Sequence, residues 1–291
     1  MSTELIAVVC ICCGSPNLDR SPAILMPFVA HRALGWAPVD IDASWGLKTV
    51  TEGRAYSLCN SLLCEGCGLV FLDLRFDNAA MSRLYADYRG EAYTNLRDLY
   101  EPGYCARNKG LQLGITYLAD IESFLRPLVP SMPRVLDWGG DTGINTPFKS
   151  HSHFVHVFDI SDVTPLPGIA RVNLAAALMH SYDLVVCSNV LEHTPHPAAT
   201  LAEISRVMNE NSVLYIEVPH EVHMRRHATG AERLKNKRHW HEHVNFYTDI
   251  ALQSLVRASG LEIIRFEEKK IVSGVFEFHQ FFVAAKLASS K

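Results

Sequence analysis

From about residue 134 onward, short apolar runs alternate with segments of helical periodicity. Arg134–Trp138, Phe154–Ile160 and Asp183–Ser188 are brief and rich in Val, Leu and Phe, as expected of strands that are buried on both faces. The same pattern predicts further strands at Val213–Val218, Leu261–Phe266 and Val275–Ala285.

Two helices between these strands carry clear boundary signals. Pro197–Met208 has proline in its first turn, and its apolar residues recur at helical spacing. Thr248 can cap a helix over 249–259, and Gly260 can end it. Alternating strands and helices predict an α/β, Rossmann-like, doubly wound and mainly parallel sheet.

The first 130 residues do not show this alternation of strands and helices. Residues 1–75 are irregular and hold most of the eight cysteines, whereas residues 76–130 contain a helical pattern that ends near Arg126-Pro127. We therefore expect a small cysteine-rich module over 1–75, a helical connector or lid over 76–130, and an α/β domain over 131–291.

Composition narrows the classes of protein. The 291 residues are 48% hydrophobic and 20% charged, with a net charge of −4, which argues for a globular chain and against a basic nucleic-acid binder. No segment approaches the 18 to 20 apolar residues of a membrane span, and the run Leu5–Val9 is too short for a signal peptide. We expect a cytoplasmic location and no nucleic-acid partner, and the sequence leaves the oligomeric state open.

Two C-x-x-C-G units occur in the first part of the chain. They consist of Cys10 and Cys13, and of Cys64 and Cys67. Paired cysteines followed by glycine suit tetrahedral Zn²⁺, which predicts a closed, structural zinc-ribbon-like site with four cysteine ligands. The alternative is a set of ordinary buried or redox-active thiols. The gap between the pairs requires an insertion to loop out.

A glycine-rich turn follows the first strand of the α/β domain and has an acidic partner. The turn runs from Asp137 through Gly139 and Gly140 to Gly143, and Asp159 ends the next strand. Glycines allow close approach of a ligand at the carboxyl end of a strand, and a carboxylate there can bind a ribose diol. A tight connection without a ligand is the alternative. The spacing is neither G-x-G-x-x-G nor a phosphate loop.

These motifs resemble a class I S-adenosylmethionine-dependent methyltransferase with a seven-stranded sheet. Val135–Gly143 is similar to its motif I, although Asp141 stands where glycine is usual, and Tyr182–His193 is similar to its motif IV with Leu-Glu-His. The resemblance implies S-adenosylmethionine as cofactor, bound by Asp137, Gly139, Gly140, Gly143, Asp159, Ile160, Asn173 and Asn189.

The N-terminal half is similar to the zinc module of sugar methyltransferases, which include C-methyltransferases of deoxysugar nucleotides. Those enzymes carry a further C-terminal domain, for which this chain has no room, so we expect O-methylation of a sugar, nucleotide sugar or glycan. C-methylation of a keto-deoxysugar nucleotide is an alternative. A second alternative is a catalytically inactive binding module, for which Asp141 is the only indication.

Histidines concentrate between residues 220 and 243. His239, His241 and His243 alternate, so they share a face of an extended segment. They predict a metal site, a general base at His243 or Glu242, or a polar loop. The resemblance favours the base, because sugar methyltransferases have a Glu-His pair here.

Further candidate residues surround this segment. His193 follows a strand at its carboxyl end, where it can orient the acceptor or cap a helix. Tyr85, Tyr88 and Tyr93 can roof a pocket or pack in the core. A basic cluster can bind a diphosphate or anionic glycan, or lie on a solvated face; it comprises Arg225, Arg226, Arg233, Lys235, Lys237 and Arg238.

Overall fold

A computed structural model describes residues 5–161, 163–274 and 276–289. Its largest sheet has seven strands in the order β13-β14-β10-β9-β6-β7-β8. Five strands run parallel, and β14 lies antiparallel to both β10 and β13. The strands are β6 (Arg134–Trp138), β7 (Phe154–Phe158), β8 (Ile169–Arg171), β9 (Leu184–Ser188), β10 (Val213–Pro219), β13 (Leu261–Ser273) and β14 (Phe276–Leu287).

The predicted mainly parallel sheet is confirmed, with two differences at its edges. β8 has only three residues, none of them buried, so it carries no hydrophobic signal. β13 continues seven residues beyond the predicted end at Phe266, because its polar outer part is paired with β14 along its whole length. Val275, the predicted first residue of the last strand, lies outside the described residues.

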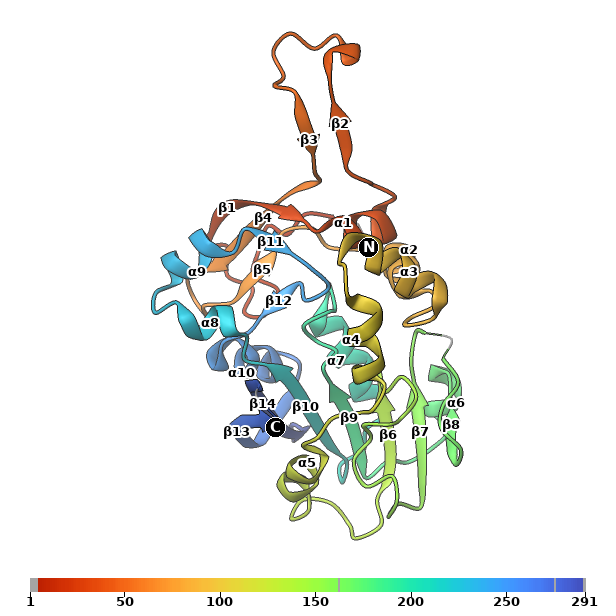
Figure 1. Cartoon of the computed structure of the whole chain (residues 1–291). Helices are drawn as coiled ribbons and strands as arrows, with labels where there is room; N and C mark the ends of the chain where they lie inside the picture. Colours follow the sequence, from red (N-terminus) through yellow and green to blue (C-terminus); the bar gives the residue numbers. More distant parts are fainter. Residues whose placement is uncertain (1–4, 162, 275, 290–291) are drawn as a thin grey trace.

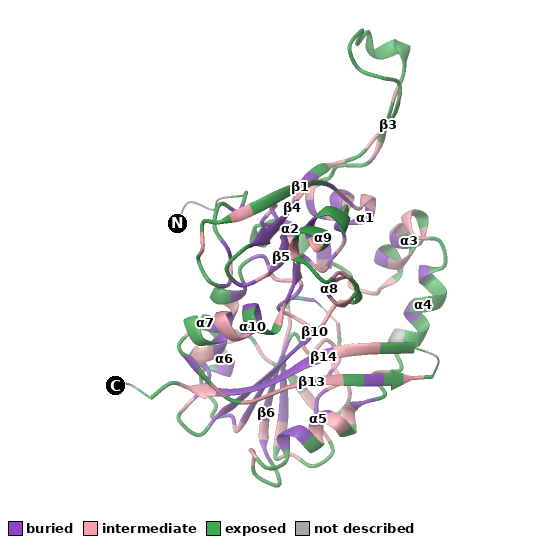
Figure 2. Ribbon diagram, turned by 90° about the vertical axis from the view of Figure 1, so that its left-hand side faces the viewer, coloured by how far each residue is buried: buried purple, intermediate pink, exposed green. Residues whose placement is uncertain are grey.

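Helices cover both faces of this sheet. On one face, α5 (Leu118–Leu125) packs with residues such as Val135 and Val186. On the other face, α6 (Leu174–Ala177), α7 (Pro197–Arg206) and α10 (Asp249–Ala258) pack with residues such as Leu136. Side chains of adjacent strand residues point to opposite faces, so the central strands β6, β9 and β10 contribute to both cores. These strands are buried along most of their length (Figure 2).

A second sheet joins the N-terminal segment to a late part of the chain. Its order is β11-β1-β4-β5-β12, with five strands. Three are N-terminal: β1 (Leu18–Leu25), β4 (Leu58–Cys64) and β5 (Val70–Leu72). The edge strands β11 (His239–Trp240) and β12 (Asn245–Phe246) flank the histidine-rich segment. This sheet therefore crosses the predicted boundary between the parts, whose three-part division stays a prediction.

The insertion between the cysteine pairs forms a projecting arm. Residues 36–57 contain a hairpin of β2 (Val39–Ile41) and β3 (Gly53–Ala55), with the 3-10 turn η2 (Ala43–Trp45) at its tip. Figure 1 shows the hairpin extending away from the rest of the molecule. None of its residues is buried.

The remaining short helices contribute to the core of the smaller sheet. They are α1 (Pro27–Val29), the π-helical turn η1 (Ala30–Leu34), α2 (Asn78–Tyr85), α3 (Glu91–Tyr100), α4 (Tyr104–Leu111), α8 (Val222–Arg226) and α9 (Gly230–Asn236). Phe28, Tyr93, Tyr104 and Trp240 belong to the core that they share with the smaller sheet. Among the described residues, no helix is long and apolar enough to cross a membrane.

Candidate functional site

The glycine-rich turn lies at the carboxyl end of β6, beside the ends of β7 and β9. Gly139 and Gly143 both have a φ of +78°, a backbone conformation that favours glycine. A Cβ at Gly139 would lie 2.5 Å from the Val190 side chain, and one at Gly143 would lie 2.4 Å from Ile169. The positive φ therefore favours glycine at both positions, and a larger side chain would also have to displace these neighbours.

Asp159 is held against this turn by backbone amides. Its two carboxylate oxygens accept hydrogen bonds from the Asp141 amide at 2.9 Å and the Ser161 amide at 2.7 Å. Asp137 lies deeper and is 4% exposed. Its carboxylate accepts a hydrogen bond from Thr146 Oγ1 at 2.5 Å, and burial raises the pKa of Asp137 to about 7.

Asp141 takes the place of a family glycine and faces a cation from the connector. It has a φ of +54°, and its Oδ2 lies 3.7 Å from Arg89 Nη1. Asp141 Oδ1 and Arg89 Nε are both buried without a hydrogen-bond partner among the described residues. A negative and a positive group with unsatisfied atoms thus meet at the turn. Arg89, in the turn between α2 and α3, was not identified from the sequence, because a lone arginine carries no signal.

The remaining predicted cofactor residues have different surroundings. Asn173 accepts a hydrogen bond from the Ala176 amide at 2.8 Å and so caps α6. Asn189 follows β9 with a φ of +53°, and Gln280 Nε2 donates to its Oδ1 at 3.4 Å. Ile160 is 60% exposed beside Asp159, which leaves an apolar surface next to the carboxylate.

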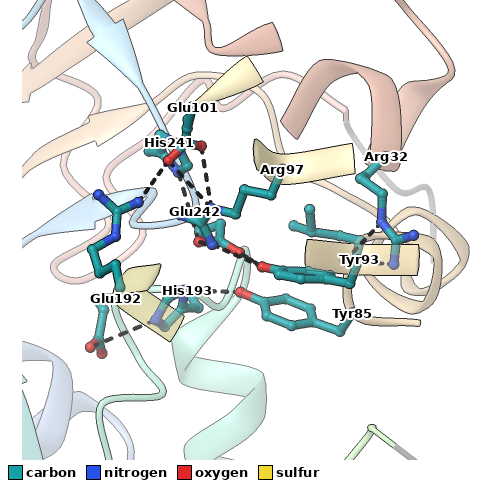
Figure 3. A network of polar contacts seen from close by, with 11 residues as sticks. Arg32, Tyr85, Tyr93, Arg97, Glu101, Glu192, His193, His241 and Glu242 are labelled. Atoms are coloured by element: carbon teal, nitrogen blue, oxygen red, sulfur yellow. Dashed lines mark hydrogen bonds and ion pairs between the residues drawn. The ribbon is translucent and has the colours of Figure 1, made fainter. Parts of the chain in front are cut away.

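Two histidines from separate segments meet beyond the end of β9. The rings of His193 and His243 pack edge to face, with centroids 4.5 Å apart. His193 Nδ1 lies 2.9 Å from the Tyr85 hydroxyl (Figure 3), and His243 Nδ1 lies 2.6 Å from Glu221 Oε1. Burial and the neighbouring His243 lower the pKa of His193 to about 3. Against the effect of its own burial, the hydrogen bond to Glu221 raises the pKa of His243.

Glu242 lies in a different network from its neighbour His243. Arg97 Nη1 lies 2.7 Å from Glu242 Oε2, and the Tyr93 hydroxyl donates to Oε1. His241 Nε2 lies 2.6 Å from Glu101 and joins the same network (Figure 3). Despite burial, His241 and Arg97 lower the pKa of Glu242. His243 and Glu242 therefore have different partners, because side chains of adjacent residues in an extended segment point to opposite sides and Glu221 lies beside His243.

A cavity of about 320 Å³ opens over this segment. It is lined by Arg97, Glu221, Lys237, His239, His241, Glu242, His243 and Phe246. Lys237 Nζ lies over the rings of Trp240 and Phe246, 4.3 Å and 4.1 Å from their centroids, and burial lowers the pKa of Lys237 to about 8. Arg97, Glu101 and Glu221 were missed in the sequence, because only the fold brings them beside the histidines.

The four cysteines of the two C-x-x-C-G units converge. Their Sγ atoms all lie within 4.8 Å of one another, with Cys10 and Cys67 3.6 Å apart and Cys13 and Cys64 3.5 Å apart. Tetrahedral Zn²⁺ with bonds of about 2.3 Å holds its sulfurs roughly 3.8 Å apart, so the residues fit this ion. Cys12 and Cys59 are buried outside the cluster.

The strand order, the glycine turn and its acidic partner define a class I S-adenosylmethionine-dependent methyltransferase. Residues 111–265, more than half of the 291-residue chain, match the family described as a methyltransferase domain. The chain belongs to this family and is a methyltransferase. No functionally curated protein matches the chain.

Solved structures with a similar fold share little sequence with this chain. The 1,6-didemethyltoxoflavin-N1-methyltransferase of Burkholderia thailandensis is 14% identical, covers 78% of this chain and 97% of its own, and has a TM-score of 0.49. A methyltransferase of Bacillus halodurans is 13% identical over 59% of this chain and 100% of its own, with a TM-score of 0.43. The magnesium protoporphyrin IX methyltransferase of Synechocystis PCC 6803 is 16% identical over 59% of this chain and 84% of its own, with a TM-score of 0.39.

Proposed function

We propose that this methyltransferase transfers a methyl group to a hydroxyl of a sugar, nucleotide sugar or glycan, with His243 as the general base. The observation that carries the proposal is the position of His243. It lies beside His193 beyond the end of β9, is held by Glu221, and lines a cavity.

The glycine turn and Asp159 are proposed to bind the cofactor. S-adenosylmethionine, when bound, supplies a methyl group that its sulfonium has already activated. Asp159 would bind the ribose diol, and Ile160 would pack against the base. Arg89 and Asp141 would meet the carboxylate and the ammonium of the methionine part, which would satisfy their buried atoms. Asn189 would line the methyl-transfer side, and Asn173 would contact the adenine from its helix cap.

His243 would accept the acceptor's proton through its Nε2. Glu221 holds Nδ1 and raises the pKa of the ring, so the free nitrogen is a competent base near neutral pH. The O–H bond breaks toward His243, the acceptor oxygen forms a bond to the methyl carbon, and the methyl–sulfur electron pair returns to sulfur. The products are the methyl ether, S-adenosylhomocysteine and protonated His243.

His193 and Glu242 would position the acceptor. Tyr85 orients the imidazole of His193, which stays neutral and can hydrogen-bond a substrate hydroxyl. Glu242 stays ionised among Arg97, Tyr93 and His241 and can accept from another hydroxyl at the cavity wall. Carbohydrates present several hydroxyls at once, so a cavity lined by imidazoles, carboxylates and a lysine suits them. C-methylation beside a sugar carbonyl would use the same base and remains the second candidate reaction.

The cluster of four cysteines is proposed to hold structural Zn²⁺. Four thiolates close the coordination shell, so such an ion would have no open position for a substrate. Its contribution would be to fold the smaller sheet, which positions the segment of His243.

Calorimetry with S-adenosylhomocysteine tests the cofactor site first. We expect micromolar binding to the wild type, loss of at least tenfold in affinity in Asp159→Ala, and unchanged affinity in the exposed control Asp249→Ala. No binding to folded protein would mean that Asp141 has closed the site, which would favour the binding-module alternative.

Transfer of a labelled methyl group to a panel of sugars and nucleotide sugars tests the base. His243→Ala should lose at least 100-fold in turnover, the lower end of what a general base contributes, and keep its affinity for S-adenosylhomocysteine. Equal turnover in wild type and variant would refute the assignment of His243.

A further inference from the structure

The side-chain carboxylate of Glu192 is buried beside His193 and receives no hydrogen bond from the described residues. Glu192 is 1% exposed, and neither of its side-chain oxygens has a hydrogen-bond partner among the described residues. A buried carboxylate is strongly unfavourable unless a cation or a donor compensates it or it takes up a proton. The family motif accounts for the position of Glu192 after β9 but not for this missing partner.

The imidazoles of His193 and His243 lie beside this carboxylate, and each has one ring nitrogen in a hydrogen bond. The Nδ1 atoms of His193 and His243 contact Tyr85 and Glu221, so Nε2 of each ring is the atom left for a ligand. His193 Nε2 lies 3.9 Å from Glu192 Oε1. Histidines that bind metal ions commonly have their other nitrogen held in this way by a hydroxyl, carbonyl or carboxylate.

We infer that Glu192, His193 and His243 form a binding site for a divalent transition-metal ion such as Mn²⁺, Fe²⁺ or Zn²⁺. One ligand atom from each residue lies within 4.8 Å of the other two. Small side-chain rotations would close this to the roughly 3.4 Å expected for bonds of about 2.1 Å in a tetrahedral set. A mixed imidazole and carboxylate set favours these ions over Mg²⁺.

The site differs from the metal alternative suggested by the alternating histidines. His241 is engaged with Glu101 at 2.6 Å, and His239 is exposed on β11. Only His243 belongs to both sets. The second histidine and the carboxylate come from the segment after β9, which the sequence does not place next to residues 239–243.

A bound ion would have open positions toward the cavity, since the protein supplies three ligands. This step rests on the proposed methyl transfer to a hydroxyl. With the ion bound, His243 would be a ligand and would no longer be the general base. An acceptor hydroxyl bound to the ion would lose its proton to solvent through the cavity, because a metal ion lowers the pKa of a bound hydroxyl. The resulting oxygen would then form the bond to the methyl carbon while the methyl–sulfur electron pair returns to sulfur.

Titration with Mn²⁺, followed by the loss of its free-ion paramagnetic resonance signal, tests the site. Mn²⁺ favours carboxylate oxygen over soft thiolate ligands, so the cysteine cluster does not compete for it. We expect one Mn²⁺ per chain in the wild-type protein and an affinity at least tenfold lower in Glu192→Gln. Glu203→Gln, on the exposed side of α7, should bind like the wild type.

His243→Ala serves as a second variant if Glu192→Gln does not fold, and it should also lose at least tenfold in affinity. Equal Mn²⁺ affinity in the wild type and in either folded variant, or no Mn²⁺ binding to wild type, would overturn the inference. This readout needs neither cofactor nor acceptor, so its failure is distinct from a failure to bind S-adenosylhomocysteine.

Discussion

At the scale of single residues, the cavity that contains Glu242 and His243 is stabilised by contacts between buried charged side chains. Arg97 is 9% exposed and contacts both Glu242, at 2.7 Å, and Glu101, at 3.3 Å. Its guanidinium also lies 4.2 Å from the centroid of the Tyr104 ring. One arginine therefore compensates two carboxylates that belong to different elements.

Removal of this arginine should destabilise the fold strongly. Arg97→Met leaves Glu242 with less compensation in a buried position, which costs about 3–5 kcal/mol. Arg107→Met removes a 58% exposed partner of Glu101 and should cost less than about 1 kcal/mol. Urea denaturation of the two variants measures the contrast, and equal losses would contradict it.

Asp137 should make stability depend on pH. Burial raises the pKa of Asp137 to about 7, against about 3.9 in the unfolded chain. Between these values the unfolded state loses a proton that the folded state keeps, so the free energy of unfolding falls as pH rises from about 4 to 7. Asp159 and Glu217 add to the shift, and Lys149 opposes it.

Asp137→Asn removes this titration and keeps an acceptor for Thr146. The difference in the free energy of unfolding, variant minus wild type, should increase by about 2 kcal/mol between pH 5 and pH 7. Urea titrations at both pH values check this. A constant difference between the two proteins would show that Asp137 is already ionised at pH 5.

At the scale of elements, the strands and caps of the larger sheet were predictable because their signals are local. Thr248 caps α10 by accepting from the Ala251 amide at 3.0 Å, as its place before an apolar helix predicts. The pairing of β11 and β12 with the N-terminal strands was not predictable. Each has two residues, and their partners lie more than 170 positions away, so neither periodicity nor spacing carries the information.

The residues of the candidate site fall into the same two groups: those that local sequence motifs indicate and those that only the tertiary structure brings together. Asp159, the glycines and His193 follow strand ends and so could be assigned from motifs. Glu221 and Arg97 touch the site only through tertiary packing, and the unpartnered state of Glu192 is visible only when its surroundings are known. Local sequence thus points to the residues proposed to bind the cofactor better than to those proposed to shape the acceptor side.

The projecting arm should be dispensable for folding. No residue between 36 and 57 is buried, and an isolated two-stranded hairpin contributes little stability by itself. Replacing residues 38–56 with a short Gly/Ser linker should change the melting temperature by less than about 2 °C and leave affinity for S-adenosylhomocysteine unchanged. A drop of about 10 °C would mean that the arm supports the module.

At the scale of the whole molecule, each of the two sheets carries a different part of the candidate site. The glycine turn and Asp159 belong to the larger sheet, whereas residues 239–243 lie between β11 and β12 of the smaller one. Thr248, just after β12, donates a hydrogen bond to the carbonyl oxygen of Cys67 at 2.7 Å. The cysteine cluster is thereby joined to the segment that carries His243.

Loss of one cysteine ligand should therefore affect the two halves of the site differently. Cys64→Ser breaks the four-cysteine set, and because metal binding is coupled to folding of such modules, we expect the melting temperature to fall by about 10 °C, equivalent to about 3 kcal/mol. Methyl transfer should fall at least tenfold at a temperature where the protein remains folded, while affinity for S-adenosylhomocysteine stays within twofold of wild type. Cys59→Ser is the matched control, since Cys59 is buried in the same module but lies outside the cluster. If Cys64→Ser lost cofactor affinity and turnover together, the smaller sheet would support the glycine turn as well, and the division of work between the sheets would be wrong.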